Sequence, residues 1–166
     1  MGALVDGLYL KLLGRAADPG GRAGLVNFLQ NGGTVEQAIV ILVTSPEYNV
    51  LAGSPAGFVQ SLYSKLLGRV ASSGEIAAWL SPLRSLGEAA VANAFLSSSE
   101  FRGDLVQQLY GFTPAASASV VVLFPNLLHR TASPSAAEVN GWVSSGLDML
   151  TITARIAGSA ECFASS

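Results

Sequence analysis

The octapeptide LYSKLLGR, Leu62–Arg69, occurs twice more in altered form, as LYLKLLGR at Leu8–Arg15 and as LFPNLLHR at Leu123–Arg130. In the first two copies, apolar residues stand in adjacent pairs that recur every four positions. These pairs are Leu4-Val5, Leu8-Tyr9 and Leu12-Leu13, then Phe58-Val59, Leu62-Tyr63 and Leu66-Leu67. Such spacing paints one broad stripe on an α-helix, whereas a strand would need alternation. The sequence therefore predicts an all-α protein made of repeated helical units.

The third copy of the octapeptide departs from the pattern. It keeps Leu123-Phe124 and Leu127-Leu128 but places Pro125 between them. Because proline lacks the N–H and clashes with the preceding turn, we expect a broken or late-starting helix here. Gly14 and Gly68 follow the stripe in the first two copies, where a helix end favours a left-handed residue, and His129 replaces them in the third.

After each octapeptide the chain reads as a turn, a second helix and a third helix. Three consecutive repeats are predicted, at residues 1–54, 55–111 and 112–166, each of about three to four helices and packed as one compact body or a short solenoid. The third helices show capping patterns at Thr34 with Gln37, at Ser85 with Glu88 and at Asp148. A linker is expected within residues 111–118.

Each repeat closes on a Ser-x-Glu pattern, in SPEY at Ser45–Tyr48, SSEF at Ser98–Phe101 and SAEC at Ser159–Cys162. This pattern predicts a helix N-cap with a carboxylate in the first turn. The glutamate follows the arginine of its octapeptide by 32, 31 and 31 positions. The predicted structural ion pairs are Arg15 with Glu47, Arg69 with Glu100, and Arg130 with Glu161.

Two interpretations of these arginines are open. Arginine presents a planar fork to carboxylates and glycans, so the three side chains could contact a ligand. A near-constant separation is what an internal ion pair requires, and we favour the ion pair. If the pair is buried, Arg69→Ala should cost several kcal/mol of stability.

The two tryptophans, Trp79 and Trp142, are candidate ligand-binding residues because an aromatic face suits the apolar C–H surface of a sugar. Each stands between aliphatic residues at helical spacing, which favours core packing instead. Tyr9 and Tyr63 continue the apolar stripe and are expected in the core with an outward hydroxyl.

Composition excludes several classes of function. Half of the residues are hydrophobic and only 12% are charged, with nine basic and eleven acidic residues and no basic cluster, so nucleic-acid binding is not expected. The only histidine, His129, and the only cysteine, Cys162, lack partners at metal-ligand spacing. The single carboxylate of the turn at Asp18 favours an N-cap over a calcium loop. No nucleophile elbow, phosphate loop or dinucleotide fingerprint occurs, so we expect no enzyme, metal or cofactor.

The longest uncharged run, Leu105–Leu128, is interrupted by glutamine, glycine, proline and asparagine, so a membrane span is not expected. The helical pattern begins directly after Met1, and no signal peptide is expected in this chain.

The repeated residues resemble a bacterial helical repeat family known as domain of unknown function 4214. The second copy matches best, the first matches well with Asp18 and Gly20 in its turn and Phe28 in place of tryptophan, and the third is degenerate at Pro125, His129 and Cys162. The positions of the second copy that carry the resemblance are Phe58, Val59, Leu62, Tyr63, Leu66, Leu67, Gly68, Arg69, Trp79, Ser98, Glu100 and Phe101. The three copies together cover nearly the whole chain, and they are distantly similar to phycobilisome linker polypeptides.

The resemblance implies a module of a large secreted or surface-attached bacterial protein and transfers no defined binding residue. We therefore expect a non-catalytic binding or scaffolding module that contacts protein partners in a cell-surface, secreted or envelope assembly. The low-charge surface, rich in small side chains, favours close packing against a partner. Two alternatives stay open: a carbohydrate-binding, lectin-like domain that recognises surface glycan, and a linker subunit of a pigment–protein complex.

Overall fold

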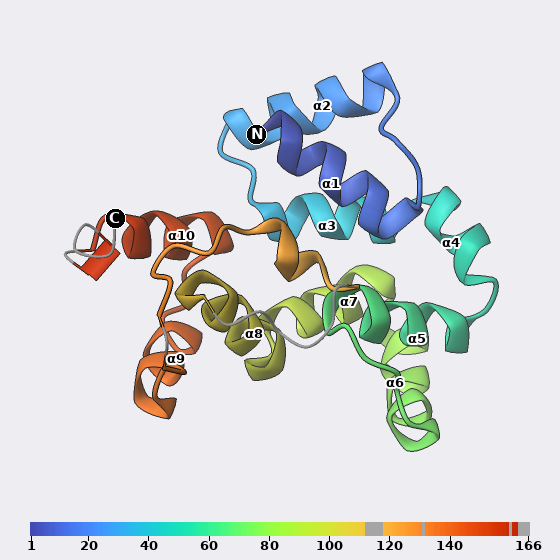
Figure 1. Cartoon of the computed structure of the whole chain (residues 1–166). Coiled ribbons are helices and arrows are strands. Elements are labelled where there is room, and N and C mark those ends of the chain that lie inside the picture. The colour runs from blue at the N-terminus through green and yellow to red at the C-terminus, as the bar shows by residue number, and fades with distance from the viewer. Residues whose placement is uncertain (112–117, 131, 160, 163–166) are drawn as a thin grey trace.

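The computed structural model describes residues 1–111, 118–130, 132–159 and 161–162, and all regular structure in these ranges is helical (Figure 1). The all-α prediction is confirmed. The elements are α1 (Gly2–Leu13), α2 (Pro19–Gln30), α3 (Val35–Val43), α4 (Pro46–Ala52), α5 (Pro55–Leu66), α6 (Ser73–Leu86), α7 (Glu88–Ser97), α8 (Ser99–Tyr110), the 3-10 helix η1 (Val120–Leu123), α9 (Ala136–Val143) and α10 (Met149–Ala157). The linker expected within 111–118 lies largely outside the described residues.

Most helix starts follow the predicted capping chemistry. Thr34 and Gln37 form a reciprocal capping box at α3, and Asp148 accepts the Thr151 N–H at α10. Ser45 caps α4 in the same way, and Ser98 caps α8. The equivalents of these serines were the Ser-x-Glu patterns of the sequence, so a hydroxyl at this position does set where the closing helix begins.

The predicted cap of α7 at Ser85 is wrong. Helix α6 continues through Pro82 and Ser85 to Leu86, and α7 begins after Gly87 without a side-chain cap. Gly87 has φ 82°, a conformation that the chain reaches cheaply only with glycine. The sharp turn therefore depends on this glycine and not on a serine hydroxyl.

The helix expected around Leu123-Phe124 is replaced by a short 3-10 turn. Helix η1 ends at Leu123, and Phe124 is already extended. The apolar pairs that precede the third LLHR come instead from the end of α8, as Leu105-Val106 and Leu109-Tyr110. The chain then leaves α8 and returns with Leu127, whose N–H donates to the carbonyl of Leu109. The third octapeptide is thus assembled from two separate segments.

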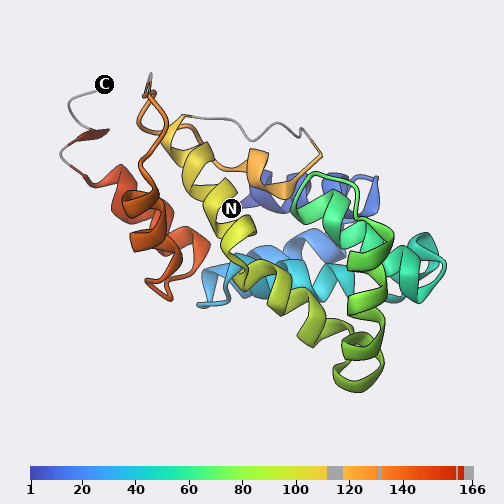
Figure 2. The same cartoon turned by 90° about the horizontal axis from the view of Figure 1, so that it is seen from below.

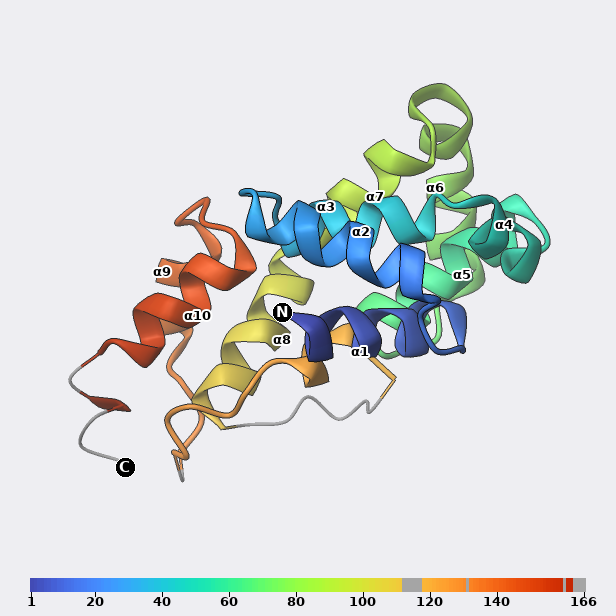
Figure 3. The same ribbon diagram turned by 90° about the horizontal axis from the view of Figure 1, so that it is seen from above.

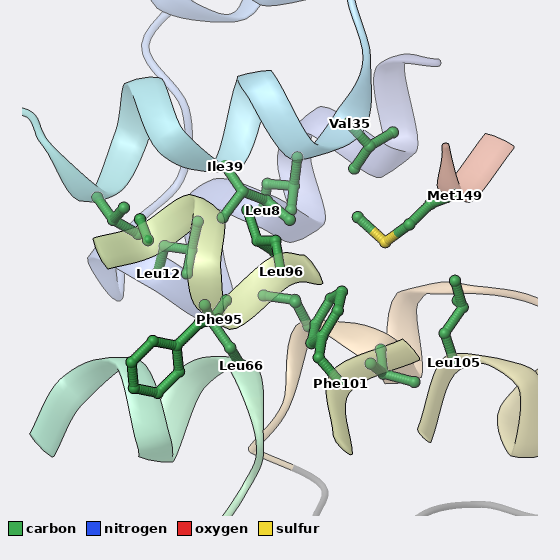
Figure 4. Packing of buried hydrophobic residues seen from close by; sticks show 14 of the residues in the cluster. Leu8, Leu12, Val35, Ile39, Leu66, Phe95, Leu96, Phe101, Leu105 and Met149 are labelled. Atoms are coloured by element: carbon green, nitrogen blue, oxygen red, sulfur yellow. The ribbon is translucent and has the colours of Figure 1, made fainter. Parts of the chain in front are cut away.

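One continuous hydrophobic core joins the helices (Figure 4). Its fully buried side chains come from α1, α3, α5, α7, α8 and α10, among them Leu8, Ile39, Leu66, Leu96, Phe101, Leu105 and Met149. Helix η1 adds Val120 and Val121, both fully buried, where it packs across α1 and α5. Burial of this apolar surface is the main force that holds the helices together.

The helices are spread along one long direction of the molecule. Helices α9 and α10 lie at one end and α4, α5 and α6 at the other, with α8 reaching from the centre toward α9 (Figures 2 and 3). Of the helices in the described part of the chain, none combines the length and the apolar character needed to cross a membrane.

Two successive junctions between helices differ. After Ser45 the chain breaks at Gly53, where φ is 70°, before α5 begins at Pro55. After Ser98 no break occurs, and α8 runs straight to Tyr110. The break forms a corner between α4 and α5 at the end of the molecule distant from α9 and α10 (Figure 1).

Candidate functional site

Arg69 lies at the centre of a charged cluster. Its Nε and Nη2 donate to the two carboxylate oxygens of Glu100 at 2.5 and 3.0 Å. Nη2 also donates to Glu75 Oε1 at 2.8 Å, and the guanidinium carbon lies 4.6 Å from the centre of the Tyr63 ring. The sequence predicted Glu100 as the partner but missed Glu75 and the ring. The N-terminal pattern Ser72-x-x-Glu75, a capping box, was the available signal for the second carboxylate.

Arg130 is surrounded in the same manner. It binds Glu161 through Nε and, at 2.6 Å, through Nη2, and its Nη1 donates to Glu138 Oε1 at 2.8 Å. Its guanidinium carbon lies 4.4 Å from the centre of the Tyr110 ring. Glu138 belongs to the capping box of α9, as Glu75 belongs to that of α6.

Arg15 shows a looser version. Its Nε and Nη2 bind Glu47 at 2.5 and 2.6 Å, and its Nη1 lies 3.6 Å from Asp18, the N-cap of α2. The Tyr9 ring centre is 5.3 Å from the guanidinium carbon. We call the clusters around Arg15, Arg69 and Arg130 the arginine centres. The structure brings each arginine to the glutamate that its spacing indicated.

The arginine centres are half-exposed and not buried. The side chains of Arg69 and Glu100 are 39% and 43% exposed. Hydrogen bonds from Arg69 and then from Ser72 lower the pKa of Glu75 to about 2. The planar fork and the face of Arg69 are therefore engaged by groups of the same chain, which leaves the ligand-contact interpretation little to use.

A left-handed residue precedes each arginine. Gly14 and Gly68 have φ values of 70° and 67°, and His129 occupies the same position with φ 47°. His129 is the one non-glycine residue with positive φ among those the structure describes. The turn that aims the arginine is thus kept in the third centre although its glycine is lost.

The tryptophans support the arginine centres from below. Trp79 Nε1 donates to the Tyr63 hydroxyl at 3.2 Å, and Trp142 Nε1 donates to the Tyr110 hydroxyl at 3.0 Å. Both indoles are partly buried, and the Trp79 ring centre lies 5.0 Å from that of Phe95. The expectation that the Tyr63 hydroxyl points outward is wrong, because the indole needs a polar partner inside the packed region.

Asp104 is an acidic neighbour that sequence reasoning missed. It stands one turn after Glu100 on α8, near Arg69. Burial, with the negative charge of Glu100 adding to it, raises the pKa of Asp104 to about 6. A charged Asp104 therefore destabilises the folded chain at neutral pH.

Glu36 ties together helices that are distant in the sequence. Its Oε1 accepts the N–H of Met149, the first residue of α10, at 2.8 Å. Arg102 on α8 donates through Nη1 to the Leu147 carbonyl at 2.5 Å and lies 4.0 Å from Glu36. Burial raises the pKa of Glu36. This cluster holds the start of α10 against α3 and α8.

The largest hollow of the described surface lies at the corner between α4 and α5, and we call it the α4–α6 groove. It has a volume of about 770 Å³ and is closed on the other side by the corner between α6 and α7. Asn49 Nδ2 donates to Glu88 Oε2 at 3.0 Å across it. Its lining residues are Thr44, Asn49, Ala52, Gly53, Ser54, Pro55, Phe58, Leu83, Arg84, Leu86, Gly87, Glu88 and Ala89.

Other chemistry is sparse in the part of the chain that the structure covers. No group of three or more His, Cys, Asp or Glu side chains lies close enough there to hold a metal ion. His129 is exposed and Cys162 is partly buried beside the Leu127 carbonyl.

A comparison with protein families matches residues 41–105 to a domain of unknown function, DUF4214. The matched segment begins in α3, ends in α8, and contains Glu47 and the whole of the Arg69 centre. No curated protein and no solved structure matches the chain.

Proposed function

We propose that the chain consists of three copies of the DUF4214 unit, the third split by an insertion, and serves as a non-catalytic protein-binding scaffold in a bacterial cell-surface, secreted or envelope assembly. Support for the three copies comes from the arginine centres, which repeat the same ion pair, ring contact and left-handed turn. In each centre the polar groups bind one another, so the repeated residues maintain the fold and leave recognition to other parts of the surface.

The observation that carries the scaffold role is the exposed apolar rim of the α4–α6 groove. Val50 on α4 is 80% exposed, and Leu86 at the end of α6 is 68% exposed. Large aliphatic side chains beside an open hollow are typical of a protein-binding surface and cost solubility when they stay uncovered. This end of the molecule is also the one left free by α9 and α10 (Figure 3).

Site-specific photo-crosslinking tests the proposal. A photoreactive amino acid at position 50 in the native bacterium should give discrete crosslinked protein species. The control is position 70, where Val70 is 79% exposed but lies at the opposite end of α5 from the groove. Equal crosslinking at the two positions, or discrete saccharide hits on a glycan array with no crosslinked protein, would contradict the scaffold role.

A further inference from the structure

The face that carries the α4–α6 groove holds both a ridge and a hollow. Val50 and Leu51 stand out from α4, at 80% and 61% exposure, while their neighbours Asn49 and Ala52 line the groove. The groove floor is apolar, with the buried Phe58 below and Leu83 at the side. A surface that contains a projection next to a matching hollow satisfies the main condition for a two-fold contact, in which one patch meets itself.

The charged groups of the rim are self-complementary. Arg84 on α6 is exposed and forms no hydrogen bond or ion pair within the described ranges of the chain. Glu88, one turn further, is held toward the groove by its hydrogen bond from Asn49. A two-fold axis through the groove places Arg84 of one copy opposite Glu88 of the other, twice. A uniformly acidic or basic partner would leave one of these two charges unpaired.

We infer that the α4–α6 groove binds a second copy of this chain, with Val50 of each protomer entering the groove of the other and Arg84 facing Glu88 across the interface. The inference rests on the proposed function, because it names the partner that the scaffold binds. The volume of the groove, about 770 Å³, admits several aliphatic side chains. The low charge of the whole surface, 12% charged residues, adds little repulsion to such pairing.

Sedimentation equilibrium over a range of chain concentrations tests the inference. We expect a monomer–dimer equilibrium, because a two-fold contact closes on itself. Val50→Glu places a charge in the partner's groove and should weaken dimerisation at least about tenfold. Val70→Glu is the matched control and should leave it unchanged. A chain that stays monomeric at every concentration, or that forms open polymers, overturns the inference.

A charge exchange identifies the partner as a second copy. Arg84→Glu and Glu88→Arg should each weaken self-association about tenfold. In an equimolar mixture of the two variants the pairing is restored, since one chain then carries two acids and the other two bases. Failure of the mixture to associate, with both variants folded by circular dichroism, contradicts the inference. A monomer that still crosslinks through position 50 to a different protein would overturn only the second copy and preserve the scaffold role.

Discussion

The N–H of Arg130 donates a hydrogen bond to the carbonyl oxygen of Tyr110 at 3.1 Å. Arg69 makes the same bond to Tyr63 at 3.2 Å, although that pair is six positions apart and the other is twenty. Fourteen extra residues therefore leave α8 and return without changing how the arginine meets the tyrosine. Such an insertion is tolerated because the cost of closing a loop grows slowly with its length.

Arg69→Ala should lower the free energy of unfolding by about 1–2 kcal/mol, less than a buried pair would cost. The reason is that the Arg69 side chain is 39% exposed but loses two carboxylate partners and a ring contact at once. Arg69→Lys should recover part of this, because a lysine keeps the charge and loses the planar fork. Urea unfolding measures the difference.

The acid dependence of that difference gives a second readout. The pKa of Glu75 is lowered to about 2 by Arg69, so its stabilising effect is present above the ordinary value of 4.5 and is lost as the pH falls toward 2. The gap between wild type and Arg69→Ala should therefore narrow over this interval. Arg155→Ala, at an exposed site on α10, serves as the control and should change little. A melting temperature unaffected by Arg69→Ala would contradict the role of the centre.

His129→Gly should stabilise the chain by about 0.5–1 kcal/mol. His129 has φ 47°, a left-handed conformation that costs an L-residue about 1 kcal/mol and that glycine adopts freely. Gly14→His makes the reverse change at the equivalent position, where φ is 70° and no atom lies within 4 Å of an added Cβ. It should destabilise by about 1 kcal/mol. Thermal unfolding of both variants checks the opposite signs; the same sign for both would show that the turn is not the cause.

Asp104→Asn should stabilise the chain at pH 7 and above. Burial raises the pKa of Asp104 to about 6 from an ordinary 3.8, so the folded state retains a proton that the unfolded state has released. The carboxyl therefore stabilises the folded state least above pH 6, and its unfavourable effect disappears as the pH falls below 3.8. Because the group is only half-buried, the expected gain at neutral pH is about 1 kcal/mol.

The pH profile separates this electrostatic cause from a packing effect. The gain from Asp104→Asn should shrink to zero near pH 3.5 in urea titrations. Asp6→Asn is the control of opposite sign, since Arg22 lowers the pKa of Asp6 through a hydrogen bond of 2.7 Å. A gain from Asp104→Asn that is constant over the whole pH range would indicate packing instead.

Much of the fold was predictable from short patterns. Paired apolar residues every fourth position mark α1 and α5, and a hydroxyl or carboxylate before a helix marks the caps at Thr34, Ser45 and Asp148, because both signals act within one or two turns. The Arg–Glu partnerships also followed from spacing. The tyrosine ring beneath each guanidinium did not, since spacing along the chain says nothing about which face of a ring is presented.

The error at Leu123-Phe124 has a physical cause. The octapeptide match there is local, and it cannot show that Tyr110 already fills the place of Tyr63. The pairs Leu105-Val106 and Leu109-Tyr110 repeat the spacing of Phe58-Val59 and Leu62-Tyr63, and they are the signal that places the insertion after α8. The α4–α6 groove was beyond reach of the sequence, because it forms where two corners of the chain meet in space.

The packing of η1 on α1 gives a last prediction, tested by a double-mutant cycle. A Cβ added at Gly7 would lie 2.7 Å from Leu123 Cδ2, so Gly7→Ala combines a gain in helix propensity of about 1 kcal/mol with a clash against η1. In a Leu123→Ala background the clash is gone, and Gly7→Ala should stabilise by about that amount. In the wild-type background the gain should be smaller or negative. The two changes are thus expected to couple by at least about 0.5 kcal/mol in urea unfolding, whereas additive effects would mean that η1 does not press on α1 in solution.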